Sequence, residues 1–191
     1  MKLKEIVFNA ESKKSAANYQ KMLKWLDSPK RYKYNNPSNL VEKAGILKGQ
    51  KVLEIGCGSG FFTAEIAKVT GNLGEVIATD IHPLAVKETA QKVEALKIEH
   101  VTVACEDAHS TSFADDSFDV IVLYGVVPSP VISLRQLSVE LSRILKPNGI
   151  CAIWTAVPFW RPVEMLKQGR FTQMKRQYPV FKLQKINHEE R

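Results

Sequence analysis

The segment from Lys51 to Thr63, KVLEIGCGSGFFT, constrains this chain more than any other. A short apolar run ends beside an acid, three glycines follow at alternate positions, and a helical pattern then begins. Glycine permits a positive φ and leaves no Cβ, so the backbone can turn sharply and approach a ligand closely. We therefore predict a strand, a tight turn and a helix start that hold a small polar ligand against backbone N–H groups.

The remaining sequence alternates short apolar runs with amphipathic stretches, which is typical of an α/β fold. We expect strands at 51–55, 75–79, 101–105, 117–123 and 150–156, followed by a terminal hairpin formed by 171–176 and 180–186. We expect helices at 11–26, 37–47, 61–69, 83–97, 131–145 and 162–167. Strands separated by helices predict a doubly wound, mostly parallel sheet with helices on both faces.

A chain of 191 residues is long enough for one domain with a sizeable core. We expect that domain to have three parts. They are an N-terminal helical cap over residues 1–50, a ligand-binding core over 51–157, and a short helix with the hairpin over 158–191. A basic, aromatic linker at 30–35 is expected to separate the first two helices.

Several features favour a cytoplasmic protein. The longest apolar run, Val120–Val127, is much shorter than a membrane span, and Met1–Glu5 lacks the apolar core of a signal peptide. The cysteines, Cys57, Cys105 and Cys151, do not have metal-ligand spacing. We therefore expect a reduced chain without a transmembrane segment, a disulfide or a metal site.

The net charge of +7 is unevenly distributed along the chain. Residues 1–51 carry 12 Lys/Arg against 4 Asp/Glu, residues 52–160 carry 7 against 13, and residues 161–191 carry 8 against 3. Basic ends around an acidic middle can bind an anionic substrate, a nucleic acid or an anionic lipid. Solvated lysines on terminal helices would give the same pattern.

Three acids are expected at the carboxyl ends of the first three strands, where sheets of this kind bind their ligands. They are Glu54, Asp80 and Asp107. Asp80 follows Gly60 by 20 residues, which suits a carboxylate that accepts both hydroxyls of a ribose. The ligand is therefore expected to contain a nucleoside.

The glycine spacing disfavours NAD as the nucleoside-containing ligand. The NAD fingerprint places glycine or alanine five residues after its first glycine, and from Gly56 that position is Phe61. A carboxylate at Glu54 would also lie badly beside a pyrophosphate, whereas it would suit a ligand with an ammonium group.

Five segments resemble, in order, the motifs of class I S-adenosylmethionine-dependent methyltransferases: Val52–Gly60, Val76–Asp80, Glu106–Ala108, Phe113–Ile121 and Arg143–Ile150. The resemblance covers roughly residues 37–157. One glycine-rich motif is weak evidence, but five motifs in order are strong. The resemblance implies a Rossmann-like, seven-stranded sheet with a C-terminal antiparallel hairpin, S-adenosylmethionine as the cofactor and S-adenosylhomocysteine as the product.

The resemblance also implies roles for single residues. The turn formed by Gly56, Cys57, Gly58 and Gly60 would lie under the methionine part of the cofactor. Glu54 would organise this turn and the ammonium end, although it could merely cap the turn.

Further along the chain, the resemblance implies that Asp80 accepts the ribose hydroxyls and Ile81 packs on the adenine. Asp107 would accept from the adenine amino group, with the Ala108 N–H nearby, and Tyr124 would lie near the reacting methyl. The structural alternatives are a helix N-cap for Asp80, a loop acid for Asp107 and a core aromatic for Tyr124.

A catalytic residue cannot be assigned from the sequence. The methyl group of a sulfonium is already activated, so the protein mainly has to position the acceptor and exclude water. Tyr124 and His109 are the candidates, and His82 is a further histidine near an expected strand end. A loop position facing solvent is the alternative for both histidines.

The sequence narrows the chemical classes from which the methyl acceptor can come. The run Tyr124–Pro128 lacks the Asn/Asp-Pro-Pro-Tyr/Phe pattern of enzymes that methylate exocyclic amines. Residues 120–130 lack the magnesium-binding acid of catechol-type enzymes. Because only 157–170 lie between the fifth strand and the hairpin, we expect the N-terminal helix, the Tyr32–Tyr34 linker and a second subunit of a homodimer to cover the substrate.

Our hypothesis is therefore a small-molecule acceptor that is anionic or membrane-associated. RNA or protein methylation is the alternative, because tyrosines alternate with basic residues at 30–34. A non-catalytic domain that binds S-adenosylmethionine also stays open, and an NAD-dependent reductase is the least favoured.

Overall fold

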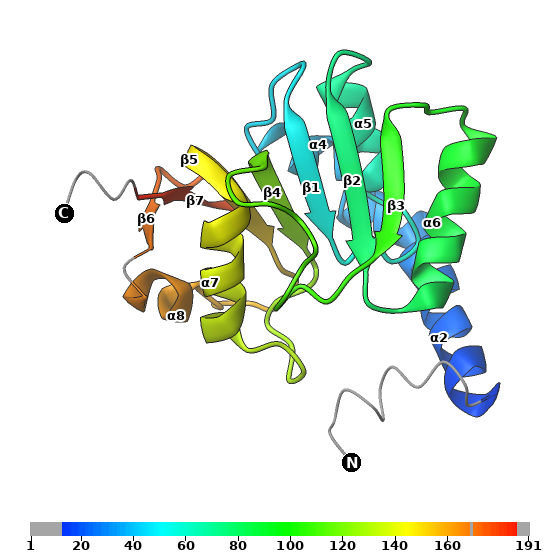
Figure 1. Ribbon diagram of the computed structural model, residues 1–191. Helices are drawn as coiled ribbons and strands as arrows, with labels where there is room; N and C mark the ends of the chain where they lie inside the picture. The colour runs from blue at the N-terminus through cyan, green and yellow to red at the C-terminus, as the bar shows by residue number, and fades with distance from the viewer. Residues whose placement is uncertain (1–12, 169, 187–191) are drawn as a thin grey trace.

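The computed structural model describes residues 13–168 and 170–186, and it contains a seven-stranded sheet with the order β3-β2-β1-β4-β5-β7-β6 (Figure 1). The strands are β1 Lys51–Ile55, β2 Glu75–Asp80, β3 Val101–Cys105, β4 Phe118–Tyr124, β5 Leu145–Trp154, β6 Phe171–Gln173 and β7 Phe181–Lys185. β1 to β5 are parallel, and β7 runs antiparallel to both β5 and β6. The predicted doubly wound sheet with a terminal antiparallel hairpin is confirmed.

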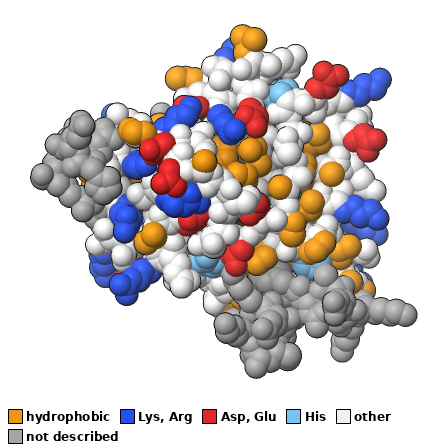
Figure 2. Space-filling model, in the orientation of Figure 1, with side chains coloured by type: hydrophobic (Ala, Val, Ile, Leu, Met, Phe, Trp, Pro, Cys, Tyr) orange, Lys and Arg blue, Asp and Glu red, His pale blue; other side chains and the backbone are white. Residues whose placement is uncertain are grey.

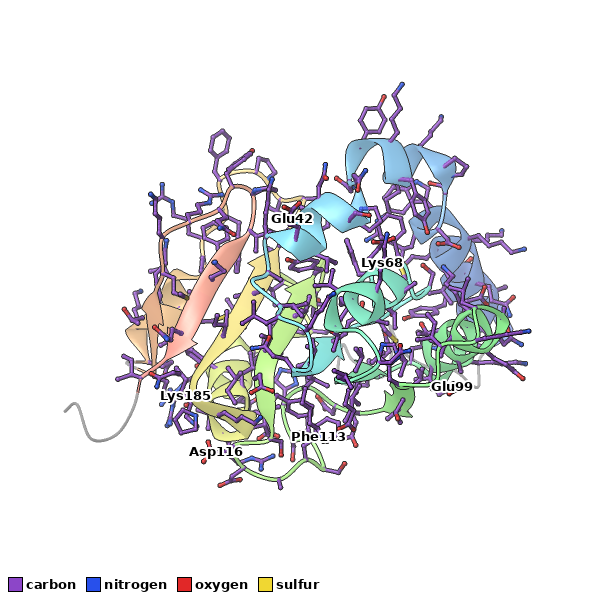
Figure 3. The ribbon with its side chains drawn as sticks, turned by 90° about the horizontal axis from the view of Figure 1, so that it is seen from above. Glu42, Lys68, Glu99, Phe113, Asp116 and Lys185 are labelled. Atoms are coloured by element: carbon purple, nitrogen blue, oxygen red, sulfur yellow. The ribbon has the colours of Figure 1, made fainter. Side chains whose placement is uncertain are left out.

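The described helices are α2 Lys13–Leu26, α3 Pro29–Tyr34, α4 Pro37–Glu42, α5 Thr63–Thr70, α6 Pro83–Ala95, α7 Leu134–Ile144 and α8 Val163–Lys167. α4 and α5 lie on one face of the sheet and α7 lies on the other (Figure 3). α6 packs against β2 and β3. No helix in the described ranges is both long and apolar enough to cross a membrane.

The core is divided between the two faces of the sheet. Val52 on β1 packs with α4 and α5, whereas its neighbour Leu53 packs with α7 and α8. Successive side chains of a strand point to opposite faces, so a strand covered on both sides is apolar at nearly every position. β4 shows this directly, since every residue of Phe118–Tyr124 except Asp119 is buried.

Three local predictions differ most from the structure, while β6 ends at Gln173 and α7 begins at Leu134, each three residues inside the expected range. The expected linker at 30–35 is largely the short helix α3, because Pro29 occupies the first turn, where its fixed φ favours a helix. The helix that starts at Pro37 ends at Glu42 rather than near Leu47. β5 begins at Leu145, and its pairing with β4 is irregular between Phe118 and Val120.

The loop between β3 and β4 is held by Arg143 of α7. The guanidinium donates to the Phe113 carbonyl at 2.7 Å, to Asp115 at 2.7 Å and to Glu140 at 2.6 Å. Lys185 of β7 reaches the same end of the sheet and pairs with Asp116 at 2.6 Å (Figure 3). One arginine therefore orders much of a segment that has no helix of its own.

α2 lies beyond the carboxyl ends of β2 and β3, below α6 in Figure 1. Its residues Tyr19 and Leu23 form a small core with Ala85 of α6. Just after the helix, Asp27 pairs with Lys92 of α6 at 2.7 Å. The N-terminal part of the chain thus covers the edge of the sheet at which the ligand is expected.

Candidate cofactor site

The glycine turn follows β1 directly. Gly56, Gly58 and Gly60 have φ values of +78°, +58° and +69°, which L side chains rarely adopt. A Cβ on Gly56 would also lie 2.5 Å from Cγ2 of Val126, in the loop after β4. The predicted need for glycine is therefore confirmed, both by backbone conformation and by the close approach of a second loop.

The N–H groups of this turn are largely used within the protein. The Gly56 and Cys57 amides donate to the Thr79 carbonyl at 2.7 and 2.9 Å, and the Gly60 amide donates to the Cys57 carbonyl at 2.8 Å. The Gly58 amide donates to Asp80 at 3.1 Å. The expectation that these amides point at a ligand is wrong; they fix the shape of the turn against β2.

Asp80 ends β2 and lies beside the turn. Its Oδ2 accepts from Gly58, while Oδ1 accepts from the His82 amide at 2.9 Å and from the Tyr19 hydroxyl at 3.4 Å. Burial raises the pKa of Asp80, although the two backbone hydrogen bonds act against that rise. The N-cap of α6 is His82 rather than Asp80, since the His82 ring accepts from the Leu84 amide.

Glu54 is buried under the turn. Its Oε2 accepts from the Thr63 hydroxyl at 2.6 Å, and this contact ties β1 to the start of α5. Burial raises the pKa of Glu54 to about 7, against the lowering effect of the Thr63 hydrogen bond. The charge of nearby Asp80 adds to the increase. Neither carboxylate forms an ion pair with any residue that the structure describes.

Two side chains from the N-terminal part of the chain reach this site. The Tyr19 ring stacks on His82 with centroids 3.6 Å apart, which brings its hydroxyl to Asp80. The Arg31 guanidinium lies 4.1 Å from the centre of the Phe61 ring and donates to the Leu26 carbonyl at 2.8 Å. Its second terminal nitrogen lies near Gly125, at 3.9 Å from where a Cβ would stand.

The residues after β3 form a compact loop at the same edge. Oδ1 of Asp107 accepts from the His109 amide at 3.0 Å and lies 2.8 Å from His109 Nδ1. His109 Nε2 accepts from the Ser133 amide at 3.0 Å, so its lone pair is engaged at the N-cap of α7. Ala108 packs partly buried against the core, and Ile81 is half-buried.

Tyr124, at the end of β4, is buried and engaged within the protein. Its hydroxyl donates to the Leu40 carbonyl at 2.7 Å, and its ring packs edge-on against Phe62 and Trp154. Burial raises the pKa of this hydroxyl far above its usual range. The side chain is a core aromatic whose hydroxyl stays protonated, and the acceptor nitrogen of His109 is engaged by Ser133, so neither residue is placed as a general base.

The donor set fits a ligand that carries positive charge and sugar hydroxyls. Two buried carboxylates, Glu54 and Asp80, form no ion pair within the described ranges, although Lys92 and Arg31 lie near enough to lower the pKa of Glu54. The Ser59 hydroxyl in the turn is also buried, and it has no hydrogen-bond partner among the described residues. A buried carboxylate without a counter-charge is costly, and a cationic ligand would offset that cost.

Sequence reasoning missed Tyr19, Arg31 and Ser59. Tyr19 lies on the apolar stripe of its helix, so the pattern indicates only a core residue. Arg31 stands in a basic run, where nothing separates it from Lys30 or Lys33. Only the folded chain brings Tyr19 and Arg31 to a turn that lies more than 20 residues away.

Comparisons with known proteins agree with this geometry. A family model described as a methyltransferase domain matches residues 46–189. Demethylmenaquinone methyltransferase of Staphylococcus aureus (strain MRSA252) is 31% identical over 114 residues, which are 58% of this chain and 45% of that protein. The chain thus spans about half the length of the curated relatives it matches.

Two solved structures show the same fold. An S-adenosylmethionine-dependent methyltransferase from Aquifex aeolicus has a TM-score of 0.72 at 23% identity, covering 86% of this chain and 96% of that one. Geranyl diphosphate C-methyltransferase from Streptomyces coelicolor A3(2) has a TM-score of 0.65 at 16% identity, covering 76% and 62%. The family match removes the NAD-dependent reductase as an alternative. The chain belongs to the methyltransferase domain family.

Proposed function

We propose that this methyltransferase acts on a small organic molecule bound at the carboxyl end of β5. The observation that carries this proposal is a cavity of about 680 Å³, a size typical of pockets for small ligands. We call it the β5 cavity. It is lined by Tyr34, Asn35, Trp154, Thr155, Ala156, Val157, Pro158, Phe159, Trp160, Arg161, Arg176, Tyr178, Pro179 and Phe181.

The β5 cavity is adjacent to the glycine turn at 56–60, which we call the cofactor turn. Trp154 lies in its wall, and the Trp154 carbonyl accepts from the Gly125 amide at 2.8 Å. The next residue, Val126, is the one that packs on Gly56. An acceptor in the cavity would therefore lie near the cofactor, and transfer would bring its accepting atom to about 3–3.5 Å from the methyl carbon.

The residues that line the β5 cavity differ from those that the sequence predicts to cover the substrate. Most of the lining comes from 154–161 and from the β6–β7 connection, while the N-terminal part contributes only Tyr34 and Asn35. The segment after β5, the β6–β7 connection and the two N-terminal residues together form a cavity within one chain.

At the cofactor turn, we assign Asp80 to the ribose hydroxyls and Glu54 to the ammonium end. Both carboxylates are buried, fixed by hydrogen bonds and close to the glycine turn, which supports these roles. Asp107, Ala108 and Ile81 lie at the same edge and keep their proposed contacts with the adenine.

The cofactor supplies an activated methyl group, so the protein's task is to bind, orient and exclude water. The aromatic walls of the β5 cavity suit the exclusion of water. No proton transfer is assigned to Tyr124 or His109, because both are engaged in structural hydrogen bonds. A proton lost by the acceptor would pass to solvent.

RNA or protein is the competing class of acceptor. Tyr32 and Tyr34 are exposed beside basic residues, which would suit stacking with bases. On the face drawn in Figure 2, however, basic and acidic side chains are interspersed, and this does not favour a nucleic-acid surface there. Relatives named for demethylmenaquinone and geranyl diphosphate support a small organic acceptor.

Labelled S-adenosylmethionine tests the proposal. The protein is incubated with the small-molecule, RNA and protein fractions of a cell extract, and the fraction that acquires the label is identified. We expect label in small molecules, and its loss in Ala156→Trp, which fills the β5 cavity while leaving S-adenosylhomocysteine affinity unchanged. Label confined to RNA or protein would contradict the proposal.

A further inference from the structure

We infer that the β5 cavity takes an acceptor with a flat, apolar body and a carboxylate or phosphate group. The geometry places an aromatic wall beside two arginines in one cavity next to the cofactor turn. This inference rests on the proposed function, because it describes the acceptor of that same site.

The wall of the cavity is strongly aromatic. Trp154, buried and held between Phe62 and Tyr124 by edge-on contacts, forms a rigid part of it. Trp160 packs edge-on against Phe181, with ring centroids 6.2 Å apart. Fixed aromatic surfaces bind flat apolar or unsaturated groups through burial and ring contacts.

Arg176 provides one positive group in the cavity. Its guanidinium lies 4.1 Å from the centre of the Phe181 ring and 5.0 Å from that of Tyr178. A guanidinium that stacks on aromatic rings keeps its N–H edge available for a planar anion. Arg176 forms no ion pair with any residue in the described part of the chain.

Arg161 provides the second positive group, from the loop that follows β5. It too lacks an acidic partner among the described residues. None of the lining residues is an aspartate or a glutamate, so the charge of the lining is not neutralised locally. An anionic group is what this combination of charge and geometry recognises best.

Phe159 stands at the rim of the cavity in an unusual state. Its side chain is fully exposed, and its φ of +62° is rare for a residue with a Cβ. An exposed aromatic ring in a disfavoured backbone conformation is found mostly where function requires it. We assign Phe159 to contact with the apolar body of the bound acceptor. Tyr34 and Tyr178, also exposed, line the same cavity.

A matched pair of probes separates charge from shape. 2-Naphthoate and 2-naphthamide are nearly equal in size, but only the first is anionic. Binding is followed by calorimetry on the full chain saturated with S-adenosylhomocysteine. We expect 2-naphthoate to bind at least tenfold more tightly than 2-naphthamide. The advantage should shrink at high salt, which screens the arginines. Equal affinity of the two probes would overturn the inference.

Charge variants locate the anion site. In Arg161→Gln/Arg176→Gln, 2-naphthoate should lose about tenfold in affinity, while 2-naphthamide changes less than twofold. Lys175→Gln, a neighbouring exposed cation outside the cavity, is the matched control and should leave both probes unaffected. Unchanged naphthoate binding in the double variant would show that the two arginines do not bind the anionic group.

Fluorescence provides a second readout that does not depend on activity. In a Trp25→Phe background the remaining tryptophans are Trp154 and Trp160, and both line the cavity. 2-Naphthoate should quench their emission, whereas Phe159→Ala should weaken quenching by both probes. Quenching that is absent despite calorimetric binding would place the probe elsewhere.

The two proposals can fail separately. If small molecules are methylated but neutral ones are preferred and the arginine variants act normally, only the inference about charge fails. If label enters RNA or protein alone, the small-molecule function fails, whatever the naphthoate affinity.

Discussion

Glu54 is the residue whose protonation the fold controls most directly. A carboxyl group buried at 2% exposure beside a second acid holds its proton to about pH 7. The folded state then binds more protons than the unfolded state between the ordinary pKa and about 7, so the free energy of unfolding falls as pH rises through that range.

We expect Glu54→Gln to remove this loss of stability. One pKa unit is worth about 1.4 kcal/mol, so the rise from the ordinary 4.5 to about 7 corresponds to at most about 3.5 kcal/mol. Urea unfolding at pH 5 and pH 8 measures it: the wild type should be less stable at pH 8, and the variant should be nearly flat. An equal pH dependence in both proteins would contradict this assignment.

The same substitution should lower the affinity of the protein for its cofactor. The ammonium group needs the ionised carboxylate, so wild-type affinity for S-adenosylhomocysteine should fall as pH drops below about 7. Glu54→Gln should bind more weakly at pH 8 and show little pH dependence. Calorimetry across this range decides between these outcomes, with Glu65→Gln as the control, because Glu65 lies on α5 but contacts Ser38 and Lys68 instead of the turn.

Arg31 is the second residue whose contribution to cofactor binding can be tested directly. Its guanidinium lies over Phe61 and beside Gly125, and the carboxylate of the methionine part is the only anionic group of the cofactor. We expect Arg31→Ala to lower S-adenosylhomocysteine affinity by about tenfold or more, as for other hydrogen bonds to charged groups.

5′-Methylthioadenosine, which lacks the amino-acid part, makes this test specific. Its affinity should be nearly the same in wild type and Arg31→Ala. Lys33→Ala, an exposed cation of the same helix, is the control. A parallel loss of both ligands would show that Arg31 instead supports the fold of the turn.

At the scale of elements, α2 covers the acid proposed to receive the ribose. Tyr19→Phe keeps the ring on His82 but removes the hydroxyl that reaches Asp80 at 3.4 Å. We expect this variant to bind S-adenosylhomocysteine about twofold to fivefold more tightly, since the bond to the carboxylate is long and is worth about 1 kcal/mol or less.

Tyr32→Phe serves as the control, because its hydroxyl contacts Asp27 rather than the turn. Weaker binding in Tyr19→Phe would mean that the hydroxyl assists the ligand and does not compete with it. Affinities from calorimetry at one pH and salt concentration are sufficient for this comparison.

The sequence predicts the elements well where one physical signal dominates. Buried strands such as β1 and β4 are apolar at almost every position, and the turn after β1 needs glycine for conformation and for space. α3 was missed because Pro29 starts a helix in a segment whose aromatic and basic residues have no periodic pattern.

Side-chain orientation at the site was less predictable. Tyr124 ends an apolar strand, so its position was foreseeable, but the direction of its hydroxyl depends on Leu40, which lies 84 residues away. The same holds for the turn amides, whose partner is the Thr79 carbonyl of β2. Such contacts follow from tertiary packing and leave no local trace in the sequence.

At the scale of the whole molecule, Arg143 joins α7 to the loop that connects the two halves of the sheet. Arg143→Met should lower the free energy of unfolding by about 1–3 kcal/mol, because Glu140 loses a charge-assisted hydrogen bond. Urea denaturation measures the loss, and Arg135→Met on the same helix is the control. If both variants were equally stable, the loop would not depend on this arginine.

The contact of Tyr19 with Asp80 also has a consequence for turnover. A group on the same chain acts at an effective concentration that can reach the millimolar range, so it refills the site as soon as the spent nucleoside leaves. The apparent dissociation constant of every nucleoside ligand is raised by the fraction of molecules closed in this way. The methyl donor and the product are weakened by the same factor, so their competition is unchanged, whereas the concentration needed to fill the site rises.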